Sequence, residues 1–277
     1  MHSLIDRYAR KSLSALLCAV LVLAGCHHNN YNSGYGIAWV TLTDEPGDFT
    51  TYTVNVDSVT LTGAANGVVT ALGTVETVDF TKLGNISELW AAANVPNDTY
   101  TSATITLDYT NAVISVLVNG VSKRATVQNT AHAAVTTITV TVNLDPSNPL
   151  VITPTPASTS AVPLAIDFNL AASNQVDTSA AVPVVTVNPY MTVGIKPADT
   201  KLIRVRGPLI NSSVGLGTYT LYVRPFYDEI NSLGSLSLFS KPNTIFTING
   251  SIYIGTAGIT ALSQLSAGTT MTAAYTT

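Results

Sequence analysis

The chain has 277 residues, of which 12 are Lys or Arg and 16 are Asp or Glu, so its formal net charge at pH 7 is −4. A chain this poor in cations lacks the basic patch that nucleic-acid binding requires, which excludes that class of partner. Only 10% of the residues are charged. We therefore expect a surface solvated by the hydroxyl and amide groups of Thr, Ser and Asn, which is usual for secreted β-proteins.

The N-terminal segment has the organisation of an export signal. Basic residues at positions 7, 10 and 11 precede an apolar run over residues 13–23, and the small residues Ala24 and Gly25 follow. A basic start, a short apolar stretch and small residues at its end are typical of secretory signals. The run is too short for a membrane span, which needs about 20 apolar residues. We predict a signal peptide over residues 1–25.

The residues Leu23-Ala24-Gly25-Cys26 resemble the lipobox of bacterial lipoproteins. The resemblance implies cleavage before Cys26, a diacylglycerol on its thiol and an acylated N-terminus. Several acyl chains together give stable membrane anchoring. The residue after Cys26 is His27 and not Asp. In such lipoproteins this implies an outer-membrane address, in the periplasmic or surface leaflet. The alternative is an ordinary signal peptide followed by a chance cysteine.

The segment that would follow cleavage is short and polar. We predict that residues 26–34 form a flexible tether. The alternative is a metal site at His27 and His28, but two adjacent histidines alone make a poor site. Cys18 would leave with the signal, so the mature chain has no pair of cysteines for a disulfide. It keeps 9 basic and 15 acidic residues, for a net charge of −6.

From Tyr35 onward, β-branched and polar residues alternate, which predicts half-buried antiparallel strands. The pair Asn119-Gly120 lies between two apolar runs and predicts a type I′ hairpin, because both central residues of that turn need positive φ. We predict an antiparallel β-sandwich domain over residues 35–196. Its strands are expected near residues 37–42, 54–61, 68–72, 75–80, 103–107, 113–118, 121–127, 135–144, 161–168 and 182–195.

Two segments of this domain are predicted to lie outside strands. Ile86, Leu89, Trp90 and Ala93 have the i, i+3, i+4, i+7 spacing of a short amphipathic helix, which Pro96 would end. Four prolines among Ser and Thr predict an extended loop from about residue 145 to residue 160.

A second group of short strands follows a linker at residues 195–200. Its strands are expected at residues 202–205, 217–226, 236–239, 244–248, 251–254 and 270–275, with one or two helical turns at 259–265. So many short strands in a small segment suggest a small Greek-key, β-barrel-like domain over residues 201–277. The complete prediction is an all-β chain with two domains.

Five sequence blocks follow one another in a characteristic order and spacing: residues 40–46, the 54–61 strand, Val78-Asp79-Phe80 to Leu83, residues 95–100 and residues 164–168. Their order and spacing resemble those of the bacterial and archaeal domain of unknown function 4382, over residues 35–195. Phe80 stands where that family usually has Leu, and Asn97-Asp98 replaces its Ala-Gly.

The C-terminal part contains the apolar block of residues 244–248 and, over residues 262–268, an approach to the last expected strand. These two features resemble domain of unknown function 5666, which often follows the first family in exported lipoproteins. Both families imply β-rich extracytoplasmic modules and no particular chemistry.

Few residue groups suit catalysis or metal binding. His132 is the only histidine of the predicted domains, in an expected loop, and no Gly-x-Ser-x-Gly elbow accompanies it. Asp44, Glu45 and Asp48 form the one tight acidic cluster, which we interpret as a strand-ending turn. A weaker alternative is a calcium site that uses Asp44 and Asp48. We predict no cofactor and no catalytic residue.

The predicted function is therefore a non-catalytic binding, adhesion or structural role at the cell envelope, anchored to the membrane through Cys26. The alternative is a carbohydrate-binding envelope module, and a hydrolase is a remote third. The expected partners are the membrane and either a polysaccharide or another envelope protein. Aromatic residues are expected mainly in the core, although some could contact sugar or a partner: Trp39, Trp90, Tyr100, Tyr109, Tyr190, Tyr219, Tyr222, Phe226 and Tyr227.

Overall fold

The structure, a computed structural model, describes residues 34–45, 47–153, 161–195, 201–224 and 233–276. The protein is all-β, as predicted, with two short α-helices and one 3-10 turn among the described residues. None of the described helices is both long enough and apolar enough to span a membrane. The predicted signal peptide lies outside the described residues, as do Cys26 and most of the tether.

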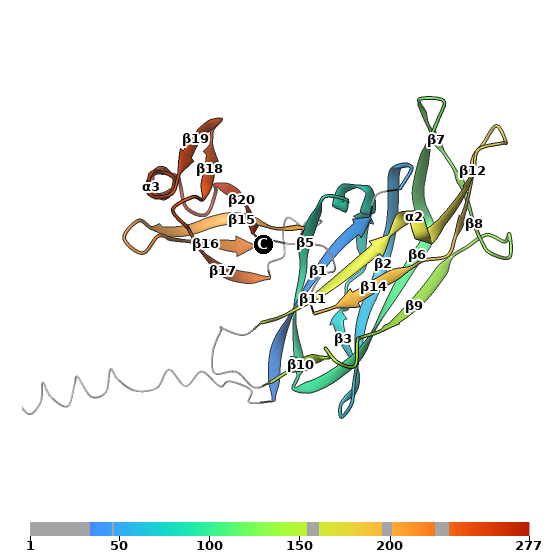
Figure 1. The fold of residues 1–277 in the computed structure, drawn as a ribbon, viewed down its shortest axis with the longest axis horizontal. Helices are drawn as coiled ribbons and strands as arrows, with labels where there is room; N and C mark the ends of the chain where they lie inside the picture. Colours follow the sequence, from blue (N-terminus) through green and yellow to red (C-terminus); the bar gives the residue numbers. More distant parts are fainter. Residues whose placement is uncertain (1–33, 46, 154–160, 196–200, 225–232, 277) are drawn as a thin grey trace, which may run out of the picture. The chain divides into compact units, whose positions relative to one another are not determined.

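Two sheets pack face to face in the first part, which confirms the β-sandwich (Figure 1). The first sheet has the order β14 (Met191–Gly194), β11 (Val162–Asn169), β1 (Tyr35–Glu45) and β5 (Ile86–Pro96). The second has the order β10 (Leu150–Ile152), β6 (Asp98–Val118), β2 (Phe49–Gly63) and β3 (Gly67–Leu72), with β4 (Glu76–Asp79) on β2 and both β7 (Val121–Arg124) and β9 (Thr137–Asn143) on β6.

A smaller sheet adjoins the sandwich. It contains β12 (Asn174–Asp177), β13 (Val184–Val187) and β8 (Thr126–Asn129). Within the described part of the sandwich and this smaller sheet most strand pairs are antiparallel, but β1 with β11 and β8 with β13 are parallel. The sandwich is therefore mixed rather than purely antiparallel. Between β4 and β5 lies the 3-10 turn η1 (Phe80–Leu83).

The core lies between the two sheets and follows from the period-two pattern. Val54, Val56, Val59 and Leu61 of β2 are all buried, although the spacing changes from two to three after Val56. The pairing register with β6 shifts at that point, which is a β-bulge. A bulge adds one residue to a strand, so it returns the apolar residues to the same face.

The predicted helix at residues 86–93 is wrong, because this segment is strand β5. It pairs antiparallel with β1 on one side and parallel with a further strand, described below, on the other. Residues 87–91 are all buried, so both faces of β5 are covered. An apolar run that is buried on both faces has no period-two signal and imitates a helix face.

Other differences are smaller. One 21-residue strand, β6, replaces the two strands expected at 103–107 and 113–118. The predicted strand at 182–195 is divided into β13 and β14, and β10 lies within the predicted loop at 145–160. The hairpin at Asn119-Gly120 is confirmed, with φ of 50° and 80°.

The second part has Greek-key order, as predicted. Its antiparallel strands follow the order β20 (Met271–Thr276), β15 (Leu202–Ser213), β16 (Thr218–Val223) and β17 (Gly234–Phe239). The last strand in sequence thus lies beside the first, which defines a Greek key. A separate hairpin of β18 (Ile245–Ile248) and β19 (Ser251–Ile254) and helix α3 (Thr256–Leu262) complete it.

The two parts share a sheet. The parallel neighbour of β5 is β15, so the first sheet of the sandwich continues into the second part. Each part has its own apolar core, and a small third cluster of Leu89, Val205 and Val223 lies where they join. Residues 34–277 form one compact unit. The division into two domains stays a prediction.

Candidate functional site

Two adjoining hollows, of about 430 Å³ and about 550 Å³, open at the end of the sandwich where β1 is followed by β2. They share four lining residues and are treated together as the loop-end hollow. Its lining combines hydroxyl, amide and carboxylate groups with apolar side chains: Gly47, Asp48, Phe49, Thr50, Val116, Leu117, Ala171, Asn174, Val176 and Thr178.

One wall of the hollow follows from the parallel pairing of β1 with β11, because both strands end at the same edge. After β11 the chain forms the single-turn helix α2 (Leu170–Ser173). The side chain of Asn169 caps it by accepting a hydrogen bond from Ala172 N at 2.8 Å. The N–H of Leu170 donates to the buried Asp44 Oδ1 at 3.1 Å. Asp44 therefore holds α2 against the end of β1.

A buried pair of tyrosines lies beneath the hollow. The Tyr52 hydroxyl donates to Asn174 Oδ1 at 3.0 Å, and the Tyr109 hydroxyl oxygen lies 3.2 Å from that of Tyr52. The Asn174 amide nitrogen donates to the Leu170 carbonyl at 2.9 Å, which fixes the orientation of this lining residue. Burial raises the pKa of both tyrosines above the ordinary 10. At neutral pH both phenols are therefore protonated and act as structural hydrogen-bond groups.

Aromatic rings connect the hollow to the core of the sandwich. The ring of Phe49, which lines the hollow, meets Tyr52 edge-on with centroids 5.1 Å apart. Tyr52 lies 5.8 Å from Phe168, and Phe168 lies 4.6 Å from Phe80. Such edge-to-face pairs favour one fixed packing arrangement. Phe49 of the hollow is therefore continuous with the buried aromatic cluster in the core of the sandwich.

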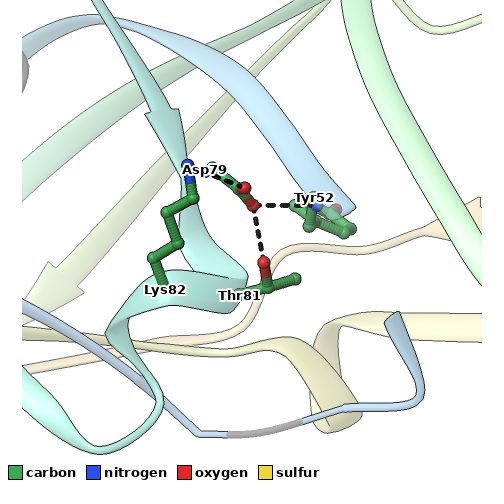
Figure 2. Close-up of polar contacts among 4 residues, drawn as sticks. All are labelled: Tyr52, Asp79, Thr81 and Lys82. Carbon is green, nitrogen blue, oxygen red and sulfur yellow. Dashed lines mark hydrogen bonds and ion pairs between the residues drawn. The ribbon is translucent and has the colours of Figure 1, made fainter. Parts of the chain in front are cut away.

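A carboxylate beside the strand holds the backbone of Tyr52. Figure 2 shows Asp79 accepting hydrogen bonds from the Tyr52 backbone N–H at 3.1 Å and from the Thr81 hydroxyl at 2.8 Å. Lys82 lies 3.7 Å from the other Asp79 oxygen, but its side chain is 65% exposed, so this ion pair contributes little. Asp79 thus fastens the start of β2 to the end of β4.

No protein-family model, curated protein or solved structure matches the chain. The chemistry of the hollow is therefore argued from its own residues.

The lining of the hollow suits hydrogen bonding to a neutral polar ligand. Thr50 and Thr178 provide exposed hydroxyls, Asn174 an amide, and Asp48 the one ionisable group among the described lining residues. Phe49 provides an apolar ring. Glycoside hydrolysis generally uses two carboxylates, and this lining provides one.

The two candidate calcium ligands are placed very differently. Asp44 is fully buried within β1, whereas Asp48 is exposed at the rim of the hollow. The predicted turn is thus only partly right, because β1 continues through Asp44 to Glu45. Within the part of the chain that the structure describes, no three His, Cys, Asp or Glu residues are grouped as metal ligands.

The remaining predicted positions are mostly structural. His132 lies on an exposed turn with φ of 59°, and its Nδ1 lies 2.9 Å from the Gln128 amide nitrogen. Tyr219 is buried and Tyr222 is 44% exposed, as expected for opposite faces of a strand. Trp90, Tyr100 and Tyr109 are core residues, Trp39 is half-buried, Tyr190 is 53% exposed, and Phe226 and Tyr227 lie outside the described residues.

The sequence analysis missed a buried ion pair between the two parts. Arg204 of β15 pairs through its Nε and a terminal nitrogen with Oε1 of Glu88 on β5. The Glu88 side chain is 3% exposed and that of Arg204 is 25% exposed. A lone acidic residue inside the apolar run at 86–93 was the available signal, since buried carboxylates are nearly always paired.

Proposed function

We propose that this protein is a lipid-anchored extracytoplasmic module that binds a ligand at the cell envelope without transforming it. The observation that carries the binding role is the loop-end hollow, whose lining residue Asn174 is held by a hydrogen bond from the buried Tyr52 and whose Phe49 packs on the same ring. The lipobox-like residues before Cys26 support the anchor. Resemblance to the two β-rich families of exported lipoproteins supports the extracytoplasmic location, and the residue at position 27 favours the outer membrane.

The anchor is tested by metabolic labelling with radioactive palmitate. Wild-type protein is expected to incorporate label and to fractionate with membranes, because the acyl chains attach at Cys26. Cys26→Ser is expected to lose the label and to keep its signal peptide, which a mass shift of the whole chain would show. Cys18→Ser is the matched control and should label normally. Equal labelling of Cys26→Ser and wild type would exclude the anchor.

Carbohydrate is the second, more specific candidate for the ligand. Hydroxyl, amide and carboxylate groups around an aromatic ring match the alternating hydroxyls and C–H face of a sugar. Asp48, Thr50, Asn174 and Thr178 line the hollow together with Phe49, which provides groups of both kinds. A hydrogen bond from a sugar hydroxyl to a carboxylate is worth about 1.5–3 kcal/mol, which is about tenfold or more in affinity.

A glycan array tests the carbohydrate candidate with three forms of the protein. Wild type is expected to bind a defined set of glycans, and Asp48→Asn to bind them about tenfold more weakly. Asp57→Asn is the matched control, because Asp57 lies on β2 and is not part of the lining. A blank array, or an equal loss with Asp57→Asn, would count against carbohydrate binding in the hollow.

A further inference from the structure

The β18–β19 hairpin presents an exposed apolar face. In its antiparallel register Ile245 lies opposite Ile254, and Thr247 opposite Ile252, so these four side chains share one face of the ribbon. Ile245 is 68% exposed, Ile252 70% and Ile254 59%. Three neighbouring isoleucines in water form a patch of the kind that marks an interaction surface.

The opposite face of the hairpin is packed, so the isoleucine face is held in place. Phe246 is buried against Tyr219, with ring centroids 6.0 Å apart, and Tyr253 packs on the same core. Helix α3 lies against Phe246 so closely that a Cβ added at Gly258 would be 2.0 Å from the phenyl ring. Figure 1 shows α3 beside β18 and β19. The face is therefore a fixed surface and not the side of a loose loop.

The segment that forms this face carries no charge. From Pro242 to Thr277 there is no Asp, Glu, Lys, Arg or His, whereas the mature chain as a whole has a net charge of −6. The charged residue next to it in sequence is Lys241, whose backbone N–H donates to Thr244 Oγ1 at the base of the hairpin. An uncharged apolar surface in a net negative protein suits contact with the apolar region of a lipid bilayer, where charged side chains are costly and isoleucine is favourable.

The segment between Cys26 and the described body is short, so an anchor at Cys26 would keep the body close to the lipid bilayer. Gly34 follows Cys26 by only eight positions. A chain of that length spans at most about 28 Å, whatever its conformation. If Cys26 is acylated, the body cannot move far from the bilayer, so the effective concentration of lipid is high for each molecule. Self-association also depends on how many copies share the membrane, whereas the lipid surface is present for every anchored molecule.

We propose that the face formed by Ile245, Ile252 and Ile254 inserts shallowly into the lipid surface and makes a second, reversible membrane contact beside the acyl anchor. The inference rests on the proposed anchor for its source of lipid. The hairpin contact would fix how the body is oriented on the membrane and hence which way the loop-end hollow faces.

Vesicle flotation tests the contact without the acyl chains. The protein is residues 26–277 with Cys26→Ser, so that neither lipid nor signal peptide contributes, and residues 34–277 form a compact unit without the N-terminal segment. Binding to phosphatidylcholine vesicles is expected, with no increase when phosphatidylglycerol is added. The triple variant Ile245→Thr, Ile252→Thr and Ile254→Thr keeps β-branched side chains and is expected to lower the partition coefficient about tenfold or more.

The matched control replaces three equally exposed valines of the sandwich, Val68→Thr, Val75→Thr and Val121→Thr, which are 68%, 61% and 59% exposed. This control should float like the parent, and circular dichroism should show that both triple variants are folded. Failure of the parent to float, or equal flotation of the isoleucine variant, would overturn the inference. A dimer seen by light scattering that the isoleucine variant abolishes, with no flotation, would assign the face to a second copy instead. Loss of palmitate labelling would remove the anchor and leave the flotation result unchanged, so the two failures are distinguishable.

Discussion

Phe168→Ala is expected to lower the free energy of unfolding by about 3–5 kcal/mol, the largest loss from a single substitution that we predict. Phe168 of β11 is fully buried, and its ring contacts Phe80 from η1 and Tyr52 from β2. These two neighbours belong to two separate elements, and Asp79 links both by hydrogen bonds to Tyr52 of β2 and Thr81 of η1. The site therefore cannot collapse around the cavity, and the cost lies at the upper end of the usual range.

Urea denaturation followed by circular dichroism measures this effect. Phe239→Ala is the matched control, since the same atoms are removed from a phenylalanine that is 76% exposed. The control is expected to change stability by less than about 0.5 kcal/mol. Similar losses for the two variants would show that Phe168 is not part of a rigid core. Phe168 contacts Tyr52, which in turn contacts Phe49 in the lining of the hollow. Phe168→Ala should therefore also weaken the binding of any ligand in the hollow.

Arg204→Met is expected to destabilise the folded chain by about 2–4 kcal/mol at pH 7. Breaking a buried ion pair costs about 3–5 kcal/mol, because the remaining charge stays buried without compensation. The partial exposure of the Arg204 side chain reduces this figure. Lys82→Met is the control, since it removes the cation of a solvent-exposed pair with Asp79. That substitution should cost less than about 1 kcal/mol.

The pH dependence of the Arg204→Met variant distinguishes lost charge compensation from lost packing. Burial raises the pKa of Glu88 above its ordinary value of 4.5, although Arg204 acts in the opposite direction. The folded state thus holds this proton more tightly than the unfolded state. The contribution of Glu88 to stability is complete below about pH 4.5 and is lost as the pH rises through the folded-state pKa.

Without Arg204 the folded-state pKa of Glu88 should rise further, because the Arg204 charge that lowers this pKa is gone. The penalty of Arg204→Met is therefore expected to be largest near neutral pH and to shrink on acidification, as Glu88 becomes a neutral acid. In the Glu88→Gln background, Arg204→Met should show no such trend. A penalty that is the same at pH 4 and pH 7 would mean that the side chain acts through packing alone.

Much of the fold could be predicted from local patterns. Alternation of β-branched and polar residues located most strands, because one face of each lies on a core and the other in water. The Asn119-Gly120 pair predicted its hairpin, since the residues that tolerate positive φ are few. The predictions of an export signal and of a lipobox, which stay predictions, likewise depend on contiguous residues alone. These features share one property: their physical cause lies within a few residues of each other.

The errors and omissions all depend on residues distant in sequence. Segment 86–96 looked helical because both faces of β5 are buried, and nothing near it in sequence shows the elements that cover those faces. Asp44 was assigned to a turn, but its partner Leu170 is 126 positions away. The pairing of Glu88 with Arg204, the loop-end hollow and the tyrosine pair each join segments that meet only after folding. A residue's own sequence neighbourhood selects its strand and turn preferences, whereas burial, charge pairing and a binding surface are set by which strands the folded sheet brings side by side.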